Sequence, residues 1–245
     1  MECSHLSEQG RSFRPKTMLR VQEVASLDYL ALYAAEYDDG GTRRPWDVVR
    51  RVHHARNKQN GDDNGGEYPH VELPIDGVDV VVILEKAAPS TTPEMVVVLQ
   101  YRPPVDAFSL EFPAGLVDPA ESPIQAALRE LHEETGYVAT PEDCDEVSAD
   151  LLAYEPGMTN SCFKLVTVHV DMTRAENQRP VQQLDGGEDI AVFCIPHNGD
   201  MLKALSELRL KTEQEQQGKR CVIDGKLFTY AAGLRAASLV AQQRR

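Results

Sequence analysis

The stretch from Gly115 to Tyr137 reads GLVDPAESPIQAALRELHEETGY, and it decides how the rest of the chain is interpreted. It holds a glycine, a glutamate six positions later at Glu121, and then the run RELHEETG over residues 129–136. Four carboxylates in so short an element repel one another unless cations lie among them. Hard divalent ions such as Mg²⁺ and Mn²⁺ prefer oxygen ligands of this kind. The stretch therefore predicts an acidic site suited to a divalent metal ion.

The same stretch predicts a loop followed by a helix. Ser122 is a good N-cap, Pro123 suits the first helical position, and Gln125 completes a capping box. We expect the helix to continue to about Thr135, because Gly136 can end it in a left-handed conformation.

Helical periodicity divides the side chains of this helix between two sides. The residues expected to face a core are Ile124, Leu128, Leu131 and Thr135. Glu130 and Glu134 lie one turn apart on the opposite side, with Glu133 beside them. Ala126 and Ala127 share this acidic side, where their small side chains are expected to leave space for ions. The alternative is an ordinary solvated acidic face, because charges four residues apart are common on exposed helices.

Composition limits the classes of protein to consider. The chain has 245 residues, 42% hydrophobic and 26% charged, with a net charge of −14. This acidic balance argues against nucleic acid or an anionic membrane as a partner. The five cysteines are scattered and odd in number, which is typical of reduced thiols in a cytoplasmic or nuclear protein. No apolar run approaches the roughly 20 residues of a membrane span.

Strand and helix patterns follow one another along the chain. Residues 18–54 predict a hairpin with a turn at Asp38–Gly41, and residues 56–69 have the composition of a loop or linker. The other predicted elements are strands at 78–84, 95–100, 161–170 and 189–195, and helices at 201–210 and 230–241. Mixed strands and helices of this kind predict an α/β sandwich.

Residues 115–137 resemble the Nudix box, Gly-x5-Glu-x7-Arg-Glu-U-x-Glu-Glu-x-Gly-U, in which U is a bulky apolar residue. Every fixed position is present, and Tyr137 occupies the last apolar one. Over roughly residues 20–240 the chain is similar to the eukaryotic ADP-sugar pyrophosphatase branch of the family. The segments that carry this similarity are 42–51, 102–104, 111–116, 156–160, 175–177 and 185–188.

The resemblance implies a fold and a division of the chain. It implies an α/β class with a Nudix-type α/β/α sandwich around a mixed sheet, plus a small N-terminal antiparallel β region. Residues 1–70 would form the N-terminal strands, used for dimerisation and substrate binding, and residues 71–245 the Nudix hydrolase domain. The expected assembly is a homodimer.

The resemblance also assigns roles to single residues. The Ala114 carbonyl, Glu130 and Glu134 would hold the metal, with Mg²⁺ expected and Mn²⁺ as the alternative. The expected catalytic residues are Glu188, Glu133 and Arg129; Glu133 is either an extra ligand or the base, and Arg129 is placed to brace it. The expected substrate contacts are Tyr29, Trp46, Asp47, Arg51, Arg102 and Leu116, with Tyr29 standing where the branch usually has tryptophan.

Three of these residues have simpler interpretations. Trp46, the only tryptophan, is either an adenine platform or a core or interface residue. Glu188 is either a mobile proton acceptor in a Gly-rich loop or part of a plain hairpin turn. Glu121 is either a direct participant in catalysis or a helix-start residue that interacts with the helix dipole.

The activity implied is metal-dependent hydrolysis of ADP-ribose and related ADP-sugars to AMP and a sugar phosphate. A house-cleaning hydrolase of oxidised nucleotides would share the Nudix box and differ in its specificity residues. A non-catalytic ADP-ribose-binding module would require a degenerate Nudix box, which this chain does not have. An RNA-cap hydrolase is disfavoured by the acidic balance.

Overall fold

The computed structural model describes residues 15–52, 73, 75–85 and 92–243. It divides the chain into two compact units, one formed by residues 1–74 with 153–161 and the other by residues 75–152 with 162–245. The predicted boundary at residue 70 and the predicted linker at 56–69 lie outside the described residues. The association of 153–161 with the N-terminal strands was not predicted.

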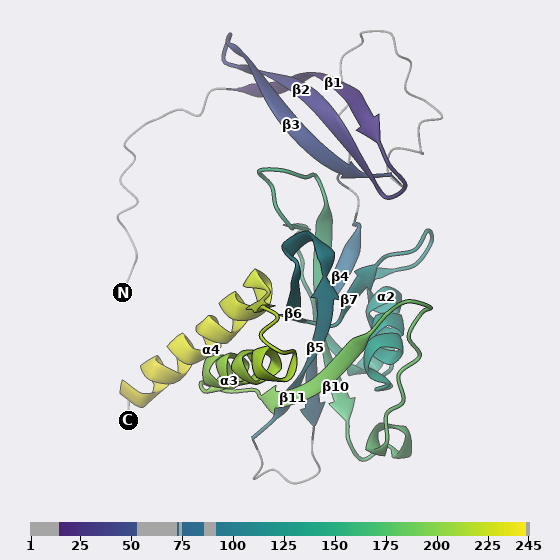
Figure 1. The fold of residues 1–245 in the computed structure, drawn as a ribbon, viewed down its shortest axis with the longest axis vertical. Helices are drawn as coiled ribbons and strands as arrows, with labels where there is room; N and C mark the ends of the chain where they lie inside the picture. The colour runs from purple at the N-terminus through teal and green to yellow at the C-terminus, as the bar shows by residue number, and fades with distance from the viewer. Residues whose placement is uncertain (1–14, 53–72, 74, 86–91, 244–245) are drawn as a thin grey trace. The chain divides into compact units, whose positions relative to one another are not determined.

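The first unit is a three-stranded antiparallel sheet in the order β1–β2–β3 (Figure 1). Its strands are β1 (Lys16–Ser26), β2 (Leu30–Asp39) and β3 (Arg43–Arg51). The predicted turn joins β2 to β3, where Gly40 and Gly41 have φ of 60° and 93°. Glycine adopts such angles without the steric cost that a Cβ brings. The predicted hairpin is therefore present, with β1 added to its outer side.

Side chains of β2 alternate between the two faces of this sheet, as a strand requires. Ala31, Tyr33 and Ala35 are buried, whereas Leu30 and Leu32 are exposed. This unit exposes many large apolar side chains. Those in its three strands and in the turn between β1 and β2 are Met18, Leu19, Val24, Leu27, Tyr29, Leu30, Leu32 and Trp46.

The second unit is built on a mixed nine-stranded sheet. Its main path runs β12–β6–β5–β4–β10–β8, while β11 pairs with β5, β7 with β4 and β9 with β10. The strands are β4 (Gly77–Glu85), β5 (Glu94–Arg102), β6 (Ala107–Glu111), β7 (Ala114–Leu116), β8 (Cys144–Val147), β9 (Leu152–Ala153), β10 (Cys162–Asp171), β11 (Ile190–Pro196) and β12 (Cys221–Ile223). Short 3₁₀ turns occur at Pro103–Val105, Pro141–Asp143 and Ala175–Gln178.

Helices cover both faces of this sheet, as an α/β/α sandwich requires (Figure 1). Helix α2 (Pro123–Glu130) packs on one face, in a core that contains Val80, Val82 and Val168. Helices α3 (Met201–Glu215) and α4 (Gly225–Gln243) pack on the other. The predicted strands and helices of this unit are confirmed, and both C-terminal helices are longer than predicted.

None of the helices in the described part of the chain is long and apolar enough to cross a membrane.

Candidate active site

The acidic helix begins as its sequence predicts. The Ser122 hydroxyl accepts the Gln125 backbone N–H at 3.3 Å, and the Gln125 side chain accepts the Ser122 N–H at 2.8 Å. Helix α2 then continues into one wide π-turn over Leu131–Thr135. Gly136 ends the helix with φ of 77°, in the left-handed conformation expected of it.

The expected role of two alanines is wrong. Ala126 and Ala127 are fully buried in the core with Leu131, and they leave no space for ions. Their small side chains let the helix lie close to the sheet. Glu130 and Glu134 share their side of the helix and are therefore turned toward the protein, where Glu134 is buried and Glu130 is partly buried. This is why the solvated-face alternative also fails.

Arg129 lies at the centre of the acidic site. Its Nε and Nη2 donate to the two carboxylate oxygens of Glu121 at 3.0 Å each. Its Nη1 donates to Glu130 at 2.7 Å and to Glu133 at 3.0 Å, which confirms the predicted brace. Its Nη2 also donates to the Leu116 carbonyl at 2.8 Å. Glu121 therefore anchors Arg129, and this contact lowers the pKa of Glu121.

Glu134 is a buried carboxylate with little compensation for its charge. Its Oε2 accepts the backbone N–H of Ala114, on β7, at 3.0 Å. Burial, helped by the negative charges of Glu130 and Glu188, raises its pKa from 4.5 to about 8. A carboxyl group in this state binds a proton or a cation readily.

Gly115, at the first position of the Nudix box, leaves room for the carboxylate of Glu130. A Cβ built on this residue would overlap the carboxylate of Glu130. Glu130 therefore lies directly against the backbone of β7, one residue beyond Ala114. Burial raises the pKa of Glu130 as well, although Arg129 opposes the shift.

The loop that carries Glu188 is tied to the π-turn at its start. The Gln182 side chain donates to the carbonyls of Glu134, at 2.6 Å, and Ile190, at 2.9 Å. Glu188 itself is exposed, and its Oε2 accepts the Asp185 N–H at 3.1 Å. This is the geometry of a plain turn, from which the side chain would have to rotate to act on substrate.

Arg102 ends β5 and is held by Glu111, a residue for which no role was predicted. Its Nε and Nη2 donate to the two oxygens of Glu111 at 2.9 and 2.6 Å. The segment 111–116 carries part of the family resemblance, but the pairing of Glu111 with Arg102 was not predicted. A second unforeseen acid is Asp79 on β4, whose pKa burial raises to about 6.

The residues of this site fit a divalent ion as part of its ligand shell. Within the described residues no three His, Cys, Asp or Glu side chains are already arranged to hold a metal ion. Glu134, which is buried, and Glu130, which is partly buried, nevertheless place two carboxylates beside the main chain of Ala114 and Gly115, with one arginine among four glutamates. Mg²⁺ is usually bound by one or two carboxylates, with water and substrate phosphates completing its shell.

The predicted adenine contacts lie in the first unit. The Trp46 indole N–H donates to the Gly157 carbonyl at 3.0 Å, and the ring meets Tyr37 edge-on at 6.3 Å. The indole is 49% exposed in this chain, so it is not a core residue here, and both the interface role and the adenine contact stay predictions. Asp47 follows Trp46 on β3, and adjacent strand residues point to opposite faces of a sheet. The two side chains therefore do not share a face.

Tyr29 and Arg51 lie toward the other end of the same sheet. Leu30, next to Tyr29, pairs with Arg51, whereas Ala35 pairs with Trp46. Five residues of strand separate the two positions by roughly 16 Å. Within one protomer, Tyr29 therefore does not stack on the same ring as Trp46, and its binding role stays a prediction.

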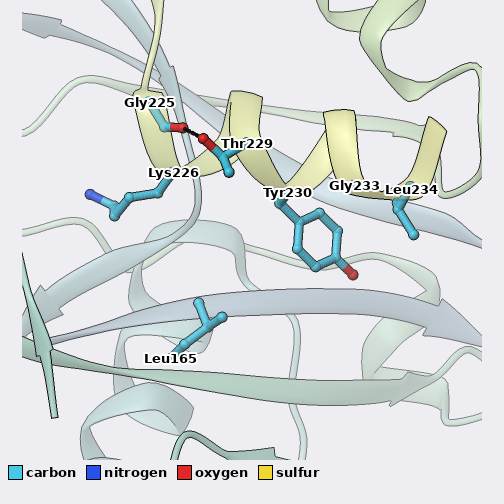
Figure 2. A pocket seen from close by; sticks show the side chains of 7 residues that line it. All are labelled: Leu165, Gly225, Lys226, Thr229, Tyr230, Gly233 and Leu234. Atoms are coloured by element: carbon cyan, nitrogen blue, oxygen red, sulfur yellow. Dashed lines mark hydrogen bonds between the residues drawn. The ribbon is translucent and has the colours of Figure 1, made fainter. Parts of the chain in front are cut away.

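The second unit also has a shallow apolar hollow of about 640 Å³ between α4 and β10 (Figure 2). It is lined by Leu165, Gly225, Lys226, Thr229, Tyr230, Gly233 and Leu234. No predicted site residue lines it. The Lys226 ammonium group lies 3.3 Å from Asp224 and 3.5 Å from the buried Asp79.

Comparison with known proteins agrees with this geometry. The NUDIX domain family matches residues 74–198. An uncharacterized Nudix hydrolase of Schizosaccharomyces pombe is 42% identical over 65% of this chain and 71% of that protein. An ADP-ribose pyrophosphatase of Saccharomyces cerevisiae is 33% identical over 87% of this chain and 80% of its own. An ADP-sugar pyrophosphatase of Mus musculus is 33% identical over 66% of this chain and 68% of that protein. With an intact Nudix box and a family match over half its length, the chain belongs to the Nudix hydrolases.

Proposed function

We propose that this chain hydrolyses the diphosphate of ADP-ribose and related ADP-sugars, giving AMP and a sugar phosphate. The observation that carries the proposal is the pair formed by the buried Glu134 and the partly buried Glu130 beside β7, in an enzyme family whose members use divalent metal ions. The substrate class is supported by two relatives named for ADP-ribose and ADP-sugars.

The metal we propose is Mg²⁺, held by Glu130, Glu134 and the Ala114 carbonyl. A bound divalent ion neutralises charge on the diphosphate and lowers the pKa of an attacking water. Glu134 must be deprotonated to act as a ligand, and its raised pKa means that metal binding will release a proton near neutral pH.

The remaining site residues orient the reactants. Arg129 keeps Glu130 and Glu133 in place through its own anchor on Glu121. Glu188 would rotate out of its turn and accept the proton of the water that attacks phosphorus. The bond between phosphorus and the bridging oxygen then breaks, and the bridging oxygen leaves with the second phosphate. Glu133 is the alternative base.

The assembly we propose is a homodimer formed through the first unit. A three-stranded sheet that exposes apolar side chains such as Leu27, Leu30 and Leu32 has the properties of an interaction surface. Molar mass measured by light scattering would test this proposal. A monomer at micromolar concentration would contradict it.

The experiment that tests the function is product analysis with Mg²⁺ and a substrate panel. The panel is ADP-ribose, ADP-mannose, a dinucleotide and 8-oxo-dGDP, with Glu134→Gln as the inactive control. AMP and ribose 5-phosphate from ADP-ribose, at the highest kcat/KM of the panel, would support the proposal. Preference for 8-oxo-dGDP would indicate a house-cleaning enzyme, and binding without turnover a binding module.

A further inference from the structure

The bidentate contact between Arg102 and Glu111 fixes the orientation of the Arg102 guanidinium group. Both oxygens of Glu111 are used, and its carboxylate is only 14% exposed, whereas the Arg102 side chain is 44% exposed. A fork of this kind holds the guanidinium plane in one orientation. Within the described residues, Nη1 makes no hydrogen bond, so one edge of the group remains available to a ligand.

Arg102 also lies near the acidic site, because its partner Glu111 stands only three residues before Ala114, whose backbone N–H donates to Glu134. Glu111 raises the pKa of Arg102 most, and Glu134 raises it further. Against the effect of burial, Arg102 in turn lowers the pKa of Glu134. The guanidinium therefore lies within the electrostatic field of the carboxylate that we assign to the metal, while its hydrogen bonds go to Glu111.

A guanidinium released from Glu111 would have a strong alternative partner. Glu134 is buried and negatively charged once deprotonated, and among the described residues its carboxylate accepts one hydrogen bond, from a backbone N–H. An arginine that turned to Glu134 would occupy the carboxylate that the cation needs. It would also remove the free Nη1 edge from the position where a phosphate would meet it.

We propose that Glu111 is a positioning residue that keeps Arg102 away from Glu134 and directs it toward the substrate diphosphate. Glu111 keeps Arg102 away from Glu134 in the protein without substrate. Its direction of Arg102 toward the diphosphate rests on the proposed function. Glu111 thereby separates two positive charges that the site must use at the same time, the cation and the arginine.

The first test measures Mn²⁺ binding by calorimetry, without any nucleotide, in a double-mutant cycle. Glu111→Gln should weaken Mn²⁺ binding about tenfold while Arg102 is present, as expected for the loss of a charged hydrogen-bonded pair. In an Arg102→Met background the same change should alter Mn²⁺ binding by less than about twofold. Equal losses in both backgrounds, or no loss in either, would overturn the proposal.

A matched control separates this effect from general loss of an ion pair. Arg209 and Glu213 on α3 form an ion pair with a single contact at 3.0 Å, away from the Nudix box, and Glu213 also accepts the Cys221 N–H. Glu213→Gln should leave Mn²⁺ affinity unchanged. Thermal unfolding of each variant shows whether it is folded. An unfolded Glu111→Gln protein would be replaced by Glu111→Asp, whose shorter side chain cannot keep both bonds and should weaken Mn²⁺ binding in the same direction.

The second test uses kinetics at saturating Mg²⁺. Glu111→Gln should raise KM for ADP-ribose about tenfold and change kcat less, because a misdirected Arg102 loses ground-state and transition-state binding alike. A fall in kcat with unchanged KM would overturn the positioning role. If the wild-type protein does not turn over ADP-ribose, the proposed function fails, and the Mn²⁺ cycle still decides the role of Glu111.

Discussion

Replacing Glu134 by glutamine should abolish most activity and yet stabilise the metal-free protein. The carboxylate is buried against the Ala114 N–H, and its pKa rises from 4.5 to about 8. The folded protein therefore holds a proton on Glu134 that the unfolded chain releases between pH 4.5 and 8. A raised pKa on an acid lowers the free energy of unfolding progressively across that range, and the full cost is present above it.

The magnitude follows from the interval between the two pKa values. At pH 7 the unfolded carboxyl group lies 2.5 pH units above its pKa of 4.5, which corresponds to ~3 kcal/mol. Above pH 8 the cost approaches ~5 kcal/mol, the whole shift. Glutamine fills the same volume and can accept the same N–H without carrying charge. The variant should therefore gain stability, and the gain should grow as the pH rises from 6 to 9.

The assay is urea unfolding in EDTA at several pH values. Glu133→Gln on the same helix is the control, because its carboxylate is 34% exposed and the loss of its pair with Arg129 should change stability by less than ~1 kcal/mol. Excess Mg²⁺ should stabilise the wild-type protein more than Glu134→Gln. Turnover of ADP-ribose should fall about 10³-fold, roughly 4 kcal/mol of transition-state stabilisation. A gain that does not change with pH, or a loss of stability in EDTA, would refute the argument.

Four further outcomes are expected. Gly136→Ala should lower the free energy of unfolding by ~1–3 kcal/mol, since φ is 77° and a Cβ would overlap the Val181 backbone; urea unfolding measures it. Asp79→Asn should raise the free energy of unfolding at pH 7 by up to ~3 kcal/mol. The pKa of Asp79 rises from 3.8 to about 6 on folding, so its ionisation destabilises the folded protein increasingly as the pH rises from 3.8 to 6. An equal effect at pH 4 would contradict this. Glu188→Gln should lower kcat about 10²-fold with ADP-ribose affinity unchanged, and a normal rate across pH would assign the base elsewhere. Trp46→Ala should weaken ADP-ribose binding by ~1–3 kcal/mol, which KM would report, and the indole emission of the wild-type protein should change when ADP-ribose binds; a normal KM in the variant would give this ring a structural role.

The local features of the acidic helix were predictable because they depend on neighbours in sequence. Ser122, Pro123 and Gln125 form the cap within four residues, and Gly136 ends the helix through its own φ. The strands of the second unit were predictable for a similar reason, because runs of β-branched residues such as 78–84 fit a buried sheet.

The direction of the acidic side was not predictable in the same way. Large apolar residues suggested one buried side, but Ala126 and Ala127 are apolar too, and they are fully buried in the core between helix and sheet. A periodic pattern cannot show which of two apolar stripes is more deeply buried. The pairing of Arg102 with Glu111 was missed because it joins the ends of two strands, and long side chains leave no trace of such a contact in local sequence.

The membership of residues 153–161 in the first unit has a consequence for how the protein is made. The N-terminal sheet has all three of its strands once residue 51 has been synthesised, but the Trp46 indole N–H and the Val49 N–H have their acceptors on Gly157 and Met158. These partners reach the ribosome exit only after the Nudix box has been translated. The first unit in sequence is therefore completed late, and a fragment that ends near residue 74 lacks an integral part of it. Cutting the gene at that point does not separate the two units, because the chain passes between them three times.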